Sequence, residues 1–224
     1  MKTPLWLSWS GGKDSSLALH ALQQSEEFEV TGLLTTVTAV YERISMHGVR
    51  RELLDQQVEA IALPLIEVLI PQKSSNEVYA EAMRKAMLDA KSQGIQHIAF
   101  GDLFLEDVRD YRIENLNKVD MQAIFPIWGR DTTELAEEFI AQGFKTILVS
   151  VDAEQIDASF AGREFDGAML NDLPESADPC GENGEFHTFV YDGPIFTQPI
   201  AVKKGEVVLR EEHFYYCDLL PSDA

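Results

Sequence analysis

The sequence predicts an α/β protein: a doubly wound parallel sheet followed by a smaller α+β domain. In the first hundred residues, short apolar runs alternate with segments of helical periodicity, the pattern of parallel strands joined by helices on both faces of a sheet. The apolar runs are nearly continuous, as in strands buried on both sides. From about Phe125 this alternation stops. We therefore predict one domain at residues 1–127 and a second at residues 128–224.

Four apolar segments are the predicted strands of the first domain: residues 5–9, 30–37, 65–70 and 95–100. Residue types that interrupt strands follow three of them, at Ser10-Gly11-Gly12, at Pro71 and at Gly101. Helices are expected between the strands, where apolar residues recur at helical spacing. The first begins near Asp14 or Ser15, and the others span residues 49–61 and 76–93.

The second domain is predicted to mix helices and strands. A helix over residues 132–142 precedes a strand over residues 146–151. The rest comprises a short helix, an acidic loop, a glycine-rich stretch at residues 180–188 and three strand-like segments in the tail, at 200–202, 207–210 and 213–218.

The composition excludes several classes of protein. The chain has 224 residues, with 18 Lys and Arg against 38 Asp and Glu, a net charge of −20. Such a charge repels phosphate backbones and disfavours a nucleic-acid partner. No apolar run reaches the length of a membrane span, and no signal peptide is recognisable at the N-terminus. The two cysteines, Cys180 and Cys217, suit a reducing compartment, so a cytoplasmic location is expected.

The strongest motif lies at residues 10–16, where the first predicted strand passes into the first helix. At such a junction, the backbone N–H groups of a glycine turn and the helix dipole attract an anion. The motif supplies two glycines, three hydroxyl groups and an ammonium group: Gly11 and Gly12, Ser10, Ser15 and Ser16, and Lys13. We therefore expect a local phosphate site on a strongly acidic protein.

This motif differs from the two common phosphate-binding glycine loops. A Walker A loop requires glycine where this chain has Leu7, and serine or threonine where it has Asp14. The GxGxxG pattern is not present either. Residues 10–16 instead resemble the SGGxDS pyrophosphate loop (PP-loop) of the N-type ATP pyrophosphatases, which split ATP into AMP and pyrophosphate. The resemblance implies that this segment binds ATP.

Further segments resemble one family within that superfamily. They are Gly101-Asp102 with residues 110–114 and 125–131, the stretch CGENGEFHT at residues 180–188, and residues 191–196. With the PP-loop they resemble the diphthine–ammonia ligase family of ATP-binding proteins, over about residues 5–196. The family fold is a Rossmann-like domain of the adenine nucleotide α-hydrolase (HUP) type with a smaller C-terminal domain, which agrees with the periodicity.

The resemblance implies an AMP-forming C–N ligase that uses ATP and Mg²⁺. A small-molecule carboxylate is adenylated, and ammonia or an amine then displaces AMP. The implied nucleotide-binding residues are Ser10, Gly11, Gly12, Lys13, Asp14, Ser15, Ser16, Gly101 and Asp102, and residues 35–38 are expected to adjoin the adenosine. The implied Mg²⁺ ligands are Asp14 and Asp102. The implied catalytic residues are Asp14, Arg112, Glu182, Glu185 and His187.

The chain departs from the family motif at two positions in the glycine-rich stretch. Asn183 stands where the family usually has glycine, and His187 stands where it usually has glutamate. Diphthine carries a cationic trimethylammonium group, which a glutamate suits and an imidazole does not. We therefore expect an acceptor other than diphthine.

Two other functions fit the same motifs. One is a non-catalytic ATP or AMP sensor, and the other is a PP-loop sulfurtransferase in which Cys180 is the nucleophile. Single residues also have structural alternatives: Asp14 as a stabiliser of the helix N-terminus and Arg112 as half of a surface ion pair. A homodimer is left open.

Overall fold

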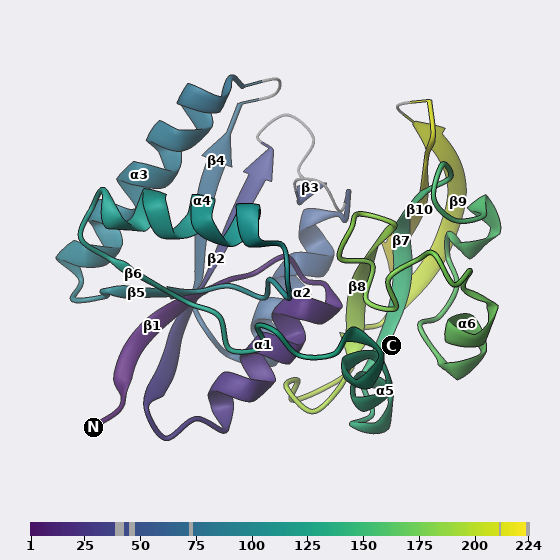
Figure 1. The fold of residues 1–224 in the computed structure, drawn as a ribbon, viewed down its shortest axis with the longest axis horizontal. Coiled ribbons are helices and arrows are strands. Elements are labelled where there is room, and N and C mark those ends of the chain that lie inside the picture. Colours follow the sequence, from purple (N-terminus) through teal and green to yellow (C-terminus); the bar gives the residue numbers. More distant parts are fainter. Residues whose placement is uncertain (39–42, 45–47, 72–73, 211, 223–224) are drawn as a thin grey trace.

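The computed structural model describes residues 1–38, 43–44, 48–71, 74–210 and 212–222. Its larger sheet has five parallel strands in the spatial order β4-β2-β1-β5-β6 (Figure 1), and β3 pairs with the end of β2 in the antiparallel direction. The strands are β1 (Thr3–Ser8), β2 (Phe28–Thr38), β3 (Arg43–Ile44), β4 (Leu65–Ile70), β5 (His97–Ala99) and β6 (Gln122–Ile124). The order reverses between β1 and β5, so ligands are expected at the carboxyl ends of these two strands.

Helices cover both faces of this sheet (Figure 1). They are α1 (Lys13–Gln23), α2 (Arg51–Ile61), α3 (Asn76–Ser92) and α4 (Glu106–Asn117). Leu5 and Leu7 of β1 pack into one apolar cluster with α1 and α2, whereas Trp6 packs into a second cluster with α3 and α4. This alternation follows the two-residue period of a strand and confirms the doubly wound α/β fold. Among the described residues, no helix combines the length and apolarity needed to cross a membrane.

The C-terminal part is built on a separate antiparallel sheet in the order β8-β7-β10-β9. Its elements are α5 (Thr132–Ala141), β7 (Lys145–Asp152), a 3₁₀ helix at Ala158–Phe160, α6 (Gly167–Asp172), β8 (Phe186–Asp192), β9 (Val202–Arg210) and β10 (Phe214–Pro221). The predicted smaller α+β part is therefore confirmed. The cluster behind α1 and α2 continues into it, where Phe139 and Phe189 are fully buried. The two parts thus share one core.

Several elements differ from the sequence-based expectations. Helix α4 was not predicted because only Leu116 of its residues is buried, so it shows no apolar period. The short strand β6 was not predicted either. Strand β8 begins at Phe186, inside the stretch that the glycines marked as a loop. The two expected tail strands at residues 200–202 and 207–210 form one continuous strand, β9.

Candidate active site

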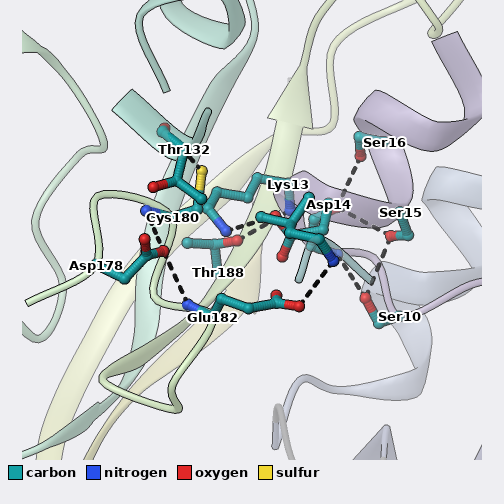
Figure 2. Close-up of polar contacts among 12 residues, drawn as sticks. Ser10, Lys13, Asp14, Ser15, Ser16, Thr132, Asp178, Cys180, Glu182 and Thr188 are labelled. Carbon is teal, nitrogen blue, oxygen red and sulfur yellow. Dashed lines mark hydrogen bonds and ion pairs between the residues drawn. The ribbon is translucent and has the colours of Figure 1, made fainter. Parts of the chain in front are cut away.

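The PP-loop connects the carboxyl end of β1 to the start of α1, as the sequence predicts (Figure 1). Figure 2 shows the side chains of Ser10, Ser15 and Ser16 at this turn. The hydroxyl groups of Ser15 and Ser16 each donate to the carbonyl oxygen of Gly12, at 2.9 Å. The Ser10 hydroxyl accepts from the Gly12 N–H at 3.3 Å and lies 3.2 Å from the Ser15 hydroxyl. These bonds hold the turn in shape at the N-terminus of α1.

Gln57 of α2, which the sequence analysis missed, supports this turn from behind. Its side chain is fully buried, and its amide donates to the carbonyl oxygens of Gly11, at 3.0 Å, and Val190, at 2.6 Å. Its own oxygen accepts from the Trp9 indole at 3.2 Å. Gly11 has a φ of +78°, and a Cβ there would lie 2.6 Å from the Gln57 oxygen. Gln57 therefore ties the PP-loop to β8 of the C-terminal part.

Replacing Gln57 by leucine is expected to lower the free energy of unfolding by about 2–4 kcal/mol, because three buried polar groups lose a partner. Urea unfolding followed by circular dichroism measures this loss. Gln23→Leu is the matched control, since Gln23 is exposed near the end of α1, and its effect should stay within about 0.5 kcal/mol. Equal effects of the two changes would contradict this role of Gln57.

Lys13 and Asp14 place a charged pair at the start of α1. The Lys13 ammonium lies 2.6 Å from an oxygen of Asp14, and its side chain is only 3% exposed. Burial raises the pKa of the Asp14 carboxyl, an effect that the Lys13 ammonium opposes. The backbone N–H of Lys13 donates to the Thr188 hydroxyl of β8 at 3.0 Å. This bond brings the glycine-rich stretch of the C-terminal part directly against the PP-loop.

The carboxyl end of β5 forms the second side of the site. Asp102 accepts two hydrogen bonds from Arg112 of α4, at 2.6 Å from Nε and 3.0 Å from Nη2. The same guanidinium lies 4.4 Å from the centre of the Phe100 ring. Two residues predicted separately from the sequence are therefore partners, and Asp102 orients Arg112 in a bidentate pair.

The third side is the turn at residues 178–185. One oxygen of Asp178 accepts from the backbone N–H groups of Cys180, at 2.9 Å, and Glu182, at 3.2 Å. Glu185 closes the turn, because one of its oxygens accepts from the Asp178 N–H at 2.7 Å and the Asn183 amide at 3.2 Å. The Glu185 side chain is 1% exposed. In this arrangement Glu185 shapes the turn from inside.

Glu182 and His187 belong to the same stretch but face the PP-loop side. A Glu182 oxygen accepts from the Leu103 N–H at 2.8 Å (Figure 2), and burial raises the pKa of this carboxyl to about 7 despite that bond. Burial, and to a lesser degree the nearby Lys13 charge, lower the pKa of His187 to about 4. At neutral pH the imidazole is therefore uncharged, while Glu182 is balanced between its two protonation states.

The three sides enclose one cavity of about 230 Å³. Its lining residues are Ser8, Ser10, Lys13, Asp14, Ser15, Phe100, Gly101, Asp102, Arg112, Gly181, Glu182, Gly184, Phe186, His187 and Thr188. Most of the residues expected at the site are among them. Gly11, Gly12, Ser16 and Glu185 lie outside this lining. Thr35 also lies outside it, and its buried hydroxyl donates to the Trp9 carbonyl at 2.7 Å.

Comparison with known proteins agrees with this arrangement. The family model of the diphthamide synthase N-terminal domain matches residues 1–122, and that of the C-terminal domain matches residues 131–219. The chain belongs to the diphthamide synthase family. Among relatives of this family, the diphthine–ammonia ligase of Bos taurus is 28% identical over 228 residues, covering 89% of this chain and 82% of the relative. The Homo sapiens ligase is 27% identical over 230 residues, covering 90% and 83%.

Membership of the diphthamide synthase family does not identify a metal ligand. Asp14 and Asp102 both line the cavity. In the described part of the chain, a cluster of three potential ligands occurs elsewhere, at Asp152, Glu154 and His213 of the C-terminal part. Two carboxylates still suffice for Mg²⁺, which keeps several waters and also binds substrate phosphates.

Proposed function

We propose that this protein is an ATP-dependent, AMP-forming C–N ligase that joins a carboxylate acceptor to ammonia or an amine. The relatives named above are diphthine–ammonia ligases. One observation carries the proposal: a single cavity is lined both by the PP-loop and by the glycine-rich stretch of the C-terminal part. A protein that only binds nucleotide has no need of this second polar wall.

The PP-loop suits the binding of a polyphosphate. The positive end of the α1 helix dipole lies at this turn. Lys13, Ser10 and Ser15 add an ammonium group and two hydroxyls at the cavity surface. An acceptor carboxylate oxygen would attack the α-phosphorus of ATP, and the bond to the leaving pyrophosphate would break. Attack of the amine nitrogen on the acyl carbon would then release AMP.

The residues present also fit a divalent cation. Burial raises the pKa of the Asp14 carboxyl although the Lys13 ammonium opposes this, so a bound cation would further favour the carboxylate form. Asp102 lies across the same cavity, with its side chain 12% exposed. Asp14 and Asp102 would hold Mg²⁺, which supplies charge neutralisation at phosphate oxygens. Arg112, whose charge Asp102 balances through Nε and Nη2, would offer Nη1 to a phosphate or carboxylate oxygen.

Glu182 is the group best placed to accept a proton from the attacking amine, because its pKa is about 7 and it lines the cavity. The deprotonated carboxylate is then the active form. The rate ratio of wild type to Glu182→Gln should rise with pH between about 6 and 8, since deprotonation proceeds over that interval. Taking the ratio cancels the ionisation of ammonium itself. The rate ratio of His187→Gln to Glu182→Gln should rise in the same way, because His187 is already neutral between about pH 6 and 8. A ratio independent of pH would exclude Glu182 as the base.

The acceptor is proposed to differ from diphthine. His187 lines the cavity, and its pKa of about 4 keeps the imidazole uncharged at neutral pH. An uncharged ring offers no carboxylate to a trimethylammonium group.

Release of pyrophosphate from ATP-Mg²⁺ and ammonium, measured with a panel of carboxylates, tests the proposed function. We expect turnover that requires both ammonium and one class of carboxylate, with AMP and amide formed in equal amounts. Tight ATP binding without pyrophosphate release from any carboxylate would favour the sensor instead. Release that needs no carboxylate would contradict a ligase.

Cys180 separates the ligase from a sulfurtransferase. The thiol is 1% exposed, and it donates to the Thr132 carbonyl at 3.3 Å. Burial raises its pKa to about 12, which disfavours the thiolate that sulfur transfer requires. Cys180→Ser is therefore expected to retain pyrophosphate release within about threefold, since a hydroxyl can donate the same bond. Complete loss of activity in a folded variant would favour the sulfurtransferase.

A further inference from the structure

A second cavity of about 350 Å³ is lined by residues of α3 and α4. Both helices lie on one side of the larger sheet (Figure 1). This volume falls in the range of about 300–1,000 Å³ typical of small-molecule sites. Phe100 and Arg112 line both this cavity and the candidate active site. The two spaces therefore meet at a common wall, and that wall is the edge of the phosphate-binding side.

The second cavity is apolar and aromatic. Tyr79, Met83 and Met87 of α3 face Phe100 and Tyr111 across it. Tyr79 and Met83 are partly buried and pack against the apolar cluster of the sheet, and burial raises the pKa of the Tyr79 phenol although Arg112 nearby lowers it. Tyr111 is 53% exposed and leaves an aromatic ring at the surface. Thioethers and aromatic rings are surfaces for an apolar ligand.

The cations in this wall are already neutralised. Arg84 pairs with Glu81, Arg112 with Asp102, and Lys118 with Glu114. Glu77 accepts a hydrogen bond from the Ser75 hydroxyl at 2.8 Å. A charged ligand would gain little electrostatic attraction here. An uncharged, apolar ligand would give up no hydrogen bonds with water on entering the cavity.

The nucleotide base fits this cavity less well than an apolar body does. A purine needs donors and acceptors along its edge, but most of the lining residues lie within α3 and α4, whose interior backbone groups pair inside the helices. The amide of Asn115 already donates to the Tyr111 carbonyl and accepts from Lys118. At the common wall, Nε and Nη2 of Arg112 donate to the two oxygens of Asp102. The third guanidinium nitrogen, Nη1, takes no part in this ion pair.

We propose that the cavity between α3 and α4 binds the uncharged, apolar or aromatic body of the carboxylate acceptor, whose carboxylate passes Arg112 to reach the phosphate-binding cavity. This inference rests on the proposed ligase function and names the chemical class of its acceptor. The substrate would be an aryl- or alkyl-substituted carboxylic acid. Small polar acids and acids with a quaternary ammonium group would be poor substrates.

The test uses 3-phenylpropionate as the probe, titrated into the full-length protein with a non-hydrolysable ATP analogue and Mg²⁺ present. Calorimetry gives the dissociation constants of probe and analogue. Met83→Trp should fill the cavity and weaken probe binding at least about tenfold while changing analogue binding less than about twofold. Leu88→Trp is the matched control, because Leu88 lies on α3 outside the cavity and is 41% exposed; it should change neither constant.

A second variant keeps the test valid if Met83→Trp does not fold. Tyr111→Ala removes an exposed ring at the cavity and should weaken probe binding about threefold to tenfold without unfolding the protein. Three outcomes would overturn the inference: no probe binding by wild type, equal probe binding by all variants, or loss of analogue binding alone in Met83→Trp, which would assign the cavity to the base. Tighter binding of trimethylglycine than of the probe would also overturn it.

A different result would contradict the proposed ligase function while leaving the cavity assignment intact. If the probe binds in the cavity and Met83→Trp blocks it, but no aryl or alkyl carboxylate supports pyrophosphate release, the cavity assignment holds and the ligase reaction is wrong.

Discussion

Asp14→Asn is expected to reduce pyrophosphate release by at least about 100-fold, the size of effect seen when a preorganised charged or polar group is removed from a reacting centre. The substitution removes the carboxylate charge from the cavity that is lined by the PP-loop, and it leaves the side-chain shape unchanged. Asparagine still offers an oxygen to the buried Lys13 ammonium, which lies 2.6 Å from Asp14. The loss should therefore appear in the rate and in the Mg²⁺ dependence, and any loss of thermal stability should be smaller than that caused by Asp14→Ala.

Alanine at the same position gives a less specific result. It would leave the Lys13 ammonium, which is 3% exposed, without its carboxylate, and a buried unpaired charge destabilises the fold. Comparison of Asp14→Asn with Asp14→Ala separates the catalytic effect from the structural one. Asp89→Asn, at an exposed position on α3, is the control and should behave as wild type. Full activity of Asp14→Asn would show that the carboxylate is only a helix stabiliser.

Gly101→Ala is expected to damage the site through the backbone. A Cβ at position 101 would lie 2.8 Å from the carbonyl carbon and oxygen of Asp14 and 3.0 Å from the Ser15 nitrogen. These are backbone atoms of the PP-loop, so the loop itself must shift. Overpacking of this kind costs about 1–3 kcal/mol of unfolding free energy. A displacement of catalytic groups by about 1 Å can also lower the rate about 100-fold.

Chemical denaturation and pyrophosphate release together measure the Gly101→Ala effect. Gly167→Ala is the matched control, because no atom lies within 4 Å of a Cβ built there. Gly167 is the first residue of α6, where alanine should leave stability unchanged or raise it by up to about 1 kcal/mol. If Gly101→Ala retained wild-type activity, the close approach of β5 to the PP-loop would not matter for function.

The fold was predictable wherever burial produces a period in the sequence. Strand β4 was predicted with its observed bounds because it is an apolar run that ends at Pro71. Helix α4 was not predicted, because Leu116 is its single buried residue and its sequence therefore shows no apolar periodicity. Strand β8 was not predicted because glycines precede it and because its first two residues are buried Phe186 and partly buried His187.

The buried position of Gln57 can be recognised from the sequence. It lies within the predicted helix over residues 49–61, four residues after Leu53 and three after Leu54, both of which are fully buried. A glutamine on the apolar face of a helix must find hydrogen-bond partners in the core. The identity of those partners, Gly11, Val190 and Trp9, could not be inferred, because each is distant in the chain.

The sequence alone predicts a turn suited to an anion at residues 10–16, since two glycines, three serines and a lysine between a strand and a helix need only local geometry for this. It also carries the family motifs in order. Only the tertiary structure decides how distant side chains meet. The Arg112 guanidinium donates to Asp102, and the Glu182 carboxylate accepts from the Leu103 N–H. The Glu185 carboxylate accepts from the Asp178 N–H of its own turn. These choices depend on packing between segments far apart in the chain, and local spacing carries no information about them.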